Sequence, residues 1–492
     1  MIGRSGLLGV LLLLLVLSPL EAIEWGPTTL LNPGQDRPFA KVEADPTDPA
    51  SVWALTAHIP IPHPDYYFFP AGGIYKSTDR GTTWTQKNDS LLTSDIPIYD
   101  IAIDPTNSEV VYLGTNTLGV LKSTDGGTTW QAINDGISYG GYTFPDDRWA
   151  VLCVEVDPVD PQTIYAGVSQ AYGVQLDQGS GEHPGLFKTT DGGTTWNERN
   201  VGLPSRSDPI TFFDLVSHTS SVWSILILPQ NPNIVLLGLV DMDVNANILG
   251  DKTARSSPRA YYSLDGGESG WLEASDGFPV IEEDRGAPFA FARVSVSMTS
   301  LAENSGTNWQ FIASHIGIRA LAIIYPQLYT DNLVQSAGVF RKFQAAPWEA
   351  INSGLPIAND LYNENSINVS PVAVSPVNPN IMLAGLMDAD SGDSLSDASK
   401  VYLSTDGGQS WQGDWTEGLS QSPNEFTEAS SFFVEINANQ TAAYASVRWD
   451  FSPEFFYSNG TQDDGIFRLP PLPPRGGTFD FVFDLNKCSG LK

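Results

Sequence analysis

Short apolar runs recur along the chain, and they are separated by polar turns rather than joined into helix-length amphipathic stretches. Five segments share one plan: a short apolar run, a turn rich in Pro, Asn and Asp, and a second apolar run. Two apolar runs around such a turn are typical of paired β-strands. We therefore expect a β-hairpin at residues 40–56, 99–115, 151–168, 224–240 and 371–387.

A second motif follows each of these hairpins and reads KSTDGGTTW in one copy. In such a segment Asp can accept hydrogen bonds from the backbone just after it, and Gly supplies the positive φ of a tight turn. The Trp then buries a large apolar face behind the turn. We interpret the aspartates as turn-holding residues and not as catalytic acids. These aspartate motifs contain Asp79, Asp125, Asp191, Asp265 and Asp406 and end at Trp84, Trp130, Trp196, Trp271 and Trp411, the fourth copy carrying one extra residue.

Each hairpin and the motif after it predict four antiparallel strands, A to D, which is the composition of one propeller blade. We expect an all-β chain with a single β-propeller of seven four-stranded blades, with six or eight as alternatives. The outer strand of the last blade comes either from residues 478–483 or from residues 28–31. The expected blades lie near residues 38–91, 99–137, 150–203, 223–277, 290–355, 369–420 and 430–485.

The pattern S-x-D-x-G-x-T-W in these copies resembles the Asp-box, or BNR repeat, of β-propellers. Proteins with this repeat include sialidases, sortilin-type receptors, xyloglucanases and photosystem II assembly factors. The resemblance implies a propeller fold but no single function, because these relatives do different things.

The A–B turns and the motif turns are short, so the extra length of the chain lies in the B–C and D–A connections. Strand alternation puts these two kinds of connection on the opposite rim, which we call the long-loop rim. Connections this long in a compact domain are often functional. They are predicted at residues 58–72, 169–184, 241–259, 316–338, 388–400 and 449–465, and at 138–149, 205–218 and 280–291.

Aromatic residues beside carboxylates in these connections suit sugar rings or a protein partner, although they can also pack the loops together. The aromatic candidates for ligand binding are Tyr66, Tyr67, Tyr142, Trp149, Phe212 and Trp449. Two connections also carry acidic residues at short intervals, and oxygen ligands in such numbers suit Ca²⁺. The candidate calcium ligands are Asp241, Asp243 and Asn245 in one connection and Asp388 and Asp390 in the other; a solvated acidic loop is the alternative.

The inner strands hold a third feature. Glu43, Glu155 and Glu435 occupy equivalent A-strand positions, so their carboxylates are expected to converge near the axis. A hydrated channel with salt links is the favoured interpretation, and an unpaired carboxylate there should have a raised pKa.

Most of the chemistry of the resembling enzymes is missing. The Arg-Ile-Pro signature and arginine cluster of sialidases are absent, and so is the second propeller of xyloglucanases. Paired carboxylates could still hydrolyse a glycosidic bond, and Asp65, Asp241 and Asp388 are the candidates. The leading prediction is a non-enzymatic module that binds a protein or glycan, with a glycoside hydrolase as the alternative.

The termini and the charge complete the prediction. Residues 1–22 read as a secretory signal peptide, with a retained anchor helix as the alternative, so we expect a secreted or periplasmic protein. A net charge of −32 argues against nucleic acid and anionic membranes as partners. Cys153 is expected in the core, with a Cys153–Cys488 bridge as the alternative. We expect no cofactor except Ca²⁺.

Overall fold

The computed structural model of the chain describes its strands and the turns that connect them on one rim. We restrict every structural statement to these residues. They are 26–27, 39–56, 73–92, 96–139, 142–145, 149–170, 185–203, 214–247, 252–278, 281–283, 290–299, 310–319, 338–343, 347–355, 367–375, 378, 380–388, 400–412, 429–436, 443–449 and 465–469.

Five antiparallel sheets have the predicted path of four strands. In four of them the strands follow one another in sequence, whereas the fifth takes one strand from the other end of the chain. The sheets are β2 (Phe39–Ala44), β3 (Val52–Thr56), β4 (Ile74–Ser77) and β5 (Thr85–Gln86); β6 (Ile98–Ile103), β7 (Val111–Thr115), β8 (Val120–Ser123) and β9 (Gln131–Ala132); β12 (Trp149–Val156), β13 (Ile164–Gln170), β14 (Leu186–Thr189) and β15 (Asn197–Glu198); β21 (Ala290–Thr299), β22 (Gln310–Arg319), β23 (Gly338–Phe343) and β24 (Glu349–Ala350); and β28 (Ala429–Ile436), β29 (Ala443–Trp449), β30 (Gly465–Leu469) and β1 (Gly26–Pro27).

Two further sheets and one small hairpin depart from the four-strand path. One sheet has a fifth strand, and another has three strands followed by an isolated bridge between Leu403 and Gln412. The prediction of seven four-stranded blades is therefore wrong in this detail, because five sheets have four strands. The other elements are β16 (Asp214–Ile227), β17 (Val235–Asn247), β18 (Lys252–Ser263), β19 (Leu272–Glu273) and β20 (Ile281–Glu283); β25 (Ile367–Val374), β26 (Met382–Asp388) and β27 (Lys400–Ser404); and the hairpin β10 (Ser138–Tyr139) and β11 (Tyr142–Thr143).

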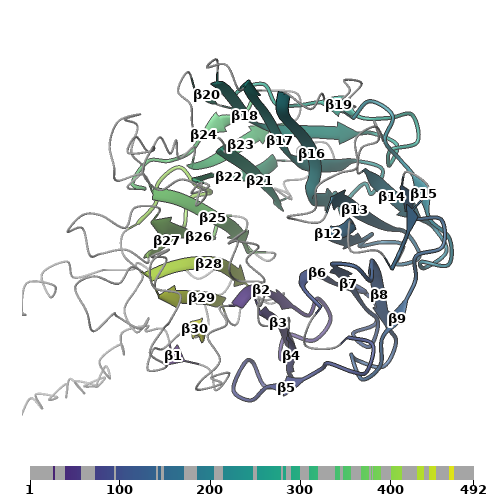
Figure 1. Cartoon of the computed structure of the whole chain (residues 1–492). Helices are drawn as coiled ribbons and strands as arrows, with labels where there is room; N and C mark the ends of the chain where they lie inside the picture. Colours follow the sequence, from purple (N-terminus) through teal and green to yellow (C-terminus); the bar gives the residue numbers. More distant parts are fainter. Residues whose placement is uncertain are drawn as a thin grey trace, which may run out of the picture.

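The sheets stand around a common axis, which makes the chain an all-β β-propeller (Figure 1). Their innermost strands neighbour one another in the order β2, β6, β12, β16, β21, β25 and β28, and β28 returns to β2. The ring closes through β1, which pairs with β30 at Gly26↔Arg468 and Pro27↔Phe467. Of the two alternatives for the outer strand, the N-terminal segment therefore provides it, through residues 26–27 immediately before the predicted 28–31.

The A–B turns and the aspartate motifs lie on the same rim, as predicted. In four sheets the first Gly of the motif donates its N–H to a carbonyl of the A–B turn, for example Gly126 to Glu109 (3.0 Å) and Gly192 to Gln162 (2.9 Å). The same bond joins Gly266 to Asn233 (2.7 Å). These contacts fix both short turns of a blade against each other, so the B–C and D–A connections leave from the other end.

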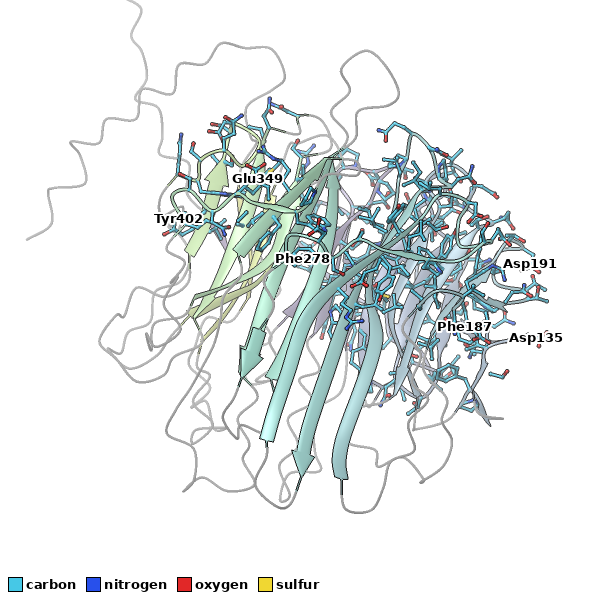
Figure 2. The ribbon with its side chains drawn as sticks, turned by 90° about the horizontal axis from the view of Figure 1, so that it is seen from above. Asp135, Phe187, Asp191, Phe278, Glu349 and Tyr402 are labelled. Carbon is cyan, nitrogen blue, oxygen red and sulfur yellow. The ribbon has the colours of Figure 1, made fainter. Side chains whose placement is uncertain are left out.

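One sheet reaches further than the others toward that other end. The β17–β18 ladder runs without a register shift from Val235↔Ser263 to Ala246↔Lys252, and β16 pairs with β17 as far as Asp214↔Asn247. Figure 2 shows these long strands passing the ends of the other sheets. The predicted connection at 241–259 is thus largely strand, and residues 214–218 of the connection predicted at 205–218 belong to β16. The polar sequence suggested loops, but backbone pairing does not require apolar side chains.

The apolar core lies between neighbouring sheets, and a tryptophan joins each of five sheets to the one before it. Trp130 packs among Leu55, Leu113 and other buried residues of the first two four-stranded sheets. Its indole Nε1 donates to the carbonyl of Lys87 in the preceding sheet (2.9 Å). Cys153 is buried between the sheet of β12–β15 and the sheet of β16–β19, as expected of a core residue. The same indole bond to the preceding sheet is made by Trp196 to Ile133, Trp271 to Arg199, Trp348 to Ala274 and Trp411 to Ile351.

Candidate functional site

The carboxylates of the aspartate motifs are occupied within their own turns. Asp125 accepts hydrogen bonds from the Thr129 N–H (2.8 Å), the Thr129 hydroxyl (2.7 Å) and the Ser123 hydroxyl (2.9 Å). The Ser123 hydroxyl also accepts the N–H of Gly127 (2.8 Å). Backbone and hydroxyl bonds from Thr129 lower the pKa of Asp125 to about 2. A carboxylate with these donors is a poor proton donor at neutral pH.

The other aspartate motifs repeat this geometry. Each carboxylate accepts from the Ser or Thr two residues before it and from the Ser or Thr four residues after it. Hydrogen bonds from Thr189 and Thr195 lower the pKa of Asp191 to about 2. These acids therefore hold the rim that carries the short turns. The remaining partners are Ser77 and Thr83 for Asp79, Ser263 and Ser269 for Asp265, and Ser404 and Ser410 for Asp406.

A group of charged side chains lies on the innermost strands, and we call Lys41, Glu43, Asp100 and Glu155 the axial cluster. The ammonium of Lys41 on β2 lies 3.0 Å from Glu43 on the same strand and 2.6 Å from Asp100 on β6. The other carboxylate oxygen of Asp100 accepts the N–H of Val154 on β12 (2.8 Å). Three successive innermost strands are thus tied by one lysine and one aspartate.

Burial and the neighbouring charges shift the pKa values of the axial cluster. Burial alone would lower the pKa of Lys41, but Asp100 and Glu43 raise it far above its ordinary value. Burial raises the pKa of Glu43, although Lys41 favours its ionised form. Burial, and then the charge of Glu43, raise the pKa of Glu155 to about 8. Glu155 therefore keeps its proton at neutral pH and can act as a hydrogen-bond donor toward the axis.

The strand register shows that the three predicted glutamates are equivalent. Glu43 is paired with Trp53, Glu155 with Tyr165 and Glu435 with Tyr444, each an aromatic residue of strand B. The sequence predicts salt links in this channel, but it identifies neither Lys41 nor its partner Asp100. The side chain of Glu435 lies outside the described part of the structure.

Three of the six predicted ligand-binding residues lie in described strands. Tyr142 is in β11, Trp149 begins β12 and Trp449 ends β29. The structure places these backbones but does not describe their side chains. Asp65, Tyr66, Tyr67, Phe212 and Asp390 lie outside the described residues.

Three of the candidate calcium ligands lie in a strand where the sequence suggested a loop. Asp241, Asp243 and Asn245 are within β17 rather than in a loop, and Asp388 is the last residue of β26. Asp243 is in register with His218 on one side and with Arg255 on the other. Among the described side chains, no group of three His, Cys, Asp or Glu residues is arranged to hold a metal ion. No helix within the described ranges is long and apolar enough to cross a membrane.

A recurring residue four positions after the motif Trp was missed by sequence reasoning. The side-chain oxygens of Asn88, Asn134 and Asn200 accept the first N–H of strand C, from Ile74 (3.2 Å), Val120 (2.8 Å) and Leu186 (2.7 Å). Asn352 binds Val339 in the same way, and Ser275 takes the equivalent place beside Ala260. The repeated W-x-x-x-N spacing was visible in the sequence and predicts such a structural role.

Comparisons with known proteins give only distant similarities to solved structures. No protein-family model matches the chain, and no curated protein matches it. YCF48 from Cyanidioschyzon merolae is similar at 13% identity and TM-score 0.41, covering 91% of this chain and 98% of its own. YCF48 bound to D1 peptide has 11% identity, TM-score 0.45 and coverages of 93% and 100%. A GH74 enzyme from Niastella koreensis has 14% identity and TM-score 0.28; the match covers 85% of this chain and only 65% of that enzyme. At TM-scores below 0.5 these similarities carry no argument, and the propeller assignment rests on the sheet order described above.

Proposed function

We propose that the chain is an exported, seven-bladed propeller of the Asp-box type that binds a protein or glycan ligand on its long-loop rim. The count of seven treats the five-stranded and three-stranded sheets as blades beside the five with four strands. The similar solved structures include a peptide-bound protein and glycoside hydrolases, and at TM-scores below 0.5 they do not decide between binding and catalysis.

The observation that supports this proposal is the full use of the polar motif groups as scaffold. Each motif carboxylate is bonded inside its turn, and in four motifs the first Gly is bonded to the A–B turn beside it. The rim of short turns therefore offers no free catalytic or metal-binding group from the motifs. We therefore assign ligand recognition to the opposite rim, for which the sequence predicts the aromatic and acidic candidates.

The proposal is tested with soluble polysaccharides as probes in affinity gel electrophoresis. We expect retardation of the native chain by at least one polysaccharide of a panel containing xyloglucan, galactomannan and alginate. Retardation should be lost in Tyr67→Ala and Trp149→Ala and kept in Thr124→Ala, an exposed position of the second aspartate motif. Loss only in the Thr124→Ala variant would place the ligand on the wrong rim and refute the proposal.

The alternative function is glycoside hydrolysis by paired acids at the same rim. The observation in its favour is that Asp241 and Asp388 both lie on B strands that run toward this rim. Release of reducing ends from the same panel, abolished in Asp65→Ala, Asp241→Ala or Asp388→Ala, would replace the binding proposal by this one. Binding without release supports the non-enzymatic module.

A further inference from the structure

The fourth aspartate motif differs from the other copies at positions that face solvent. In the fourth copy Leu264 precedes the motif Asp. The other four copies have a threonine there, namely Thr78, Thr124, Thr190 and Thr405. The residue after the motif Trp is polar in the other copies, for example Gln131 and Gln412, and is Leu272 in the fourth. Four repeats thus serve as an internal reference, and they show that the turn itself does not require leucine.

A third apolar residue lies against the same turn. Val201 stands where the preceding and following repeats have Asp135, Asp276 or Ser353. The carbonyl of Val201 accepts the N–H of Trp271 (2.8 Å), and Trp271 directly precedes Leu272 in the chain. A Cβ placed on Gly270 of the motif would lie 3.0 Å from Val201 Cγ1.

These three side chains are exposed, and we call Val201, Leu264 and Leu272 the fourth-motif patch. Their exposed fractions are 70%, 58% and 56%. Among the described side chains four large apolar residues are exposed, and three of them form this patch. One exposed leucine is ordinary, but several at one turn that is polar in the other repeats indicate a contact surface.

The charges around the fourth-motif patch define the partner. The exposed ionisable residues close to it in the sequence include Glu198, Glu273 and Asp276, all acidic. The nearby basic groups are already engaged, because Lys188 and Arg199 both bind Glu268 (3.0 and 3.1 Å). An incoming segment therefore meets apolar surface within an acidic border.

We propose that the fourth-motif patch docks a protein segment whose apolar side chains are flanked by lysine or arginine. A second copy of this chain fits poorly, because a symmetric contact would bring the same acids together and each copy carries a net charge of −32. An anionic lipid surface is repelled for the same reason. The site lies at the outermost strand of its blade, away from the long-loop rim, so it is independent of the proposed function.

The test uses a fluorescein-labelled synthetic peptide of alternating leucine and lysine, measured by fluorescence anisotropy at physiological ionic strength. The patch variant Val201→Ser, Leu264→Thr, Leu272→Gln carries the residue types that other repeats tolerate, and it changes no charge. We expect it to weaken peptide binding by about 30-fold or more, since each apolar side chain buried on docking contributes on the order of 1 kcal/mol or more. Val159→Thr, an exposed position on a neighbouring A–B turn, is the matched control and should bind as the native chain does.

Several results would overturn the proposal. Equal binding by the native chain and the patch variant would mean that the peptide senses only the overall charge. Equal binding of a leucine–glutamate peptide would remove the role of the acidic border. Native self-association in sedimentation, or flotation with phosphatidylcholine vesicles, abolished in the patch variant, would assign the surface to a second copy or to lipid. If the triple variant does not fold, Leu272→Gln alone provides the same comparison with a smaller expected loss.

Discussion

Gly136 marks a place where one methyl group should break the contact between two blades. It has a φ of 92°, a region in which an L-residue costs about 1–2 kcal/mol relative to glycine. A Cβ there would also overlap the carbonyl oxygen of Trp196 in the next sheet. Trp196 would have to move, although its N–H donates to Asp135 (2.8 Å) and its indole to Ile133 (2.6 Å).

The magnitude follows from these terms. Each inter-sheet hydrogen bond contributes about 1 kcal/mol, and displacing a packed ring costs a further 1–3 kcal/mol or so. Allowing for partial relaxation, Gly136→Ala should lower the free energy of unfolding by about 3–5 kcal/mol. Gly407→Ala is the control, because its φ is 71° but its Cβ would meet only Asn380 Oδ1 at 3.3 Å. It should cost about 1–2 kcal/mol.

Urea unfolding of both variants, followed by tryptophan fluorescence, measures the difference between them. Both should keep the native dependence on urea and differ in midpoint, with Gly136→Ala the less stable by about 2–3 kcal/mol. Equal midpoints would refute the reasoning, because the backbone strain is common to both variants and only the clash with Trp196 separates them.

Three further predictions concern the blade contacts, the axial cluster and the proposed metal. Trp196→Phe removes the indole donor and leaves the Ile133 carbonyl without it, so the free energy of unfolding should fall by about 1–3 kcal/mol in the same urea assay. Glu155 has an ordinary pKa of 4.5 and a pKa of about 8 in the folded chain. Between these pH values the unfolded chain has lost the Glu155 proton while the folded chain still holds it, so the free energy of unfolding falls as pH rises from 4.5 to 8. Glu155→Gln should remove that decline in unfolding midpoints measured at pH 5, 7 and 9, and an unchanged profile contradicts the raised pKa. We propose a calcium site near Asp241 and Asp243; added Ca²⁺ should then raise the melting temperature of the native chain but not of the Asp241→Ala variant, and no shift in the native chain would exclude the site.

Much of the blade could be predicted because its turns depend on interactions between residues that are close in the sequence. The hydrogen bonds of Asp125 all fall within a few residues, so the motif reveals its turn by itself. The rim carrying both short turns followed from strand alternation. The length of β16 to β18 could not be read in this way, because a polar strand and a polar loop have similar composition and only pairing partners distinguish them.

The site was less predictable than the fold. The equivalence of Glu43 and Glu155 was visible in the repeat, but the partner of Lys41 is Asp100, 59 positions away on another sheet. The leucines of the fourth-motif patch were present in the sequence and could have been found by comparing the repeats position by position. Their exposure, however, depends on how the outer strand sits in its blade.

The turns, the hairpins and the repeated unit follow from the order of residues alone, because those features depend on φ preferences and hydrogen bonds between near neighbours. Contacts between the sheets set which sheet each tryptophan bonds, which terminus closes the ring and which charges meet at the axis. Those contacts join residues such as Trp196 and Ile133, 63 positions apart, and they exist only once the sheets stand around a common axis.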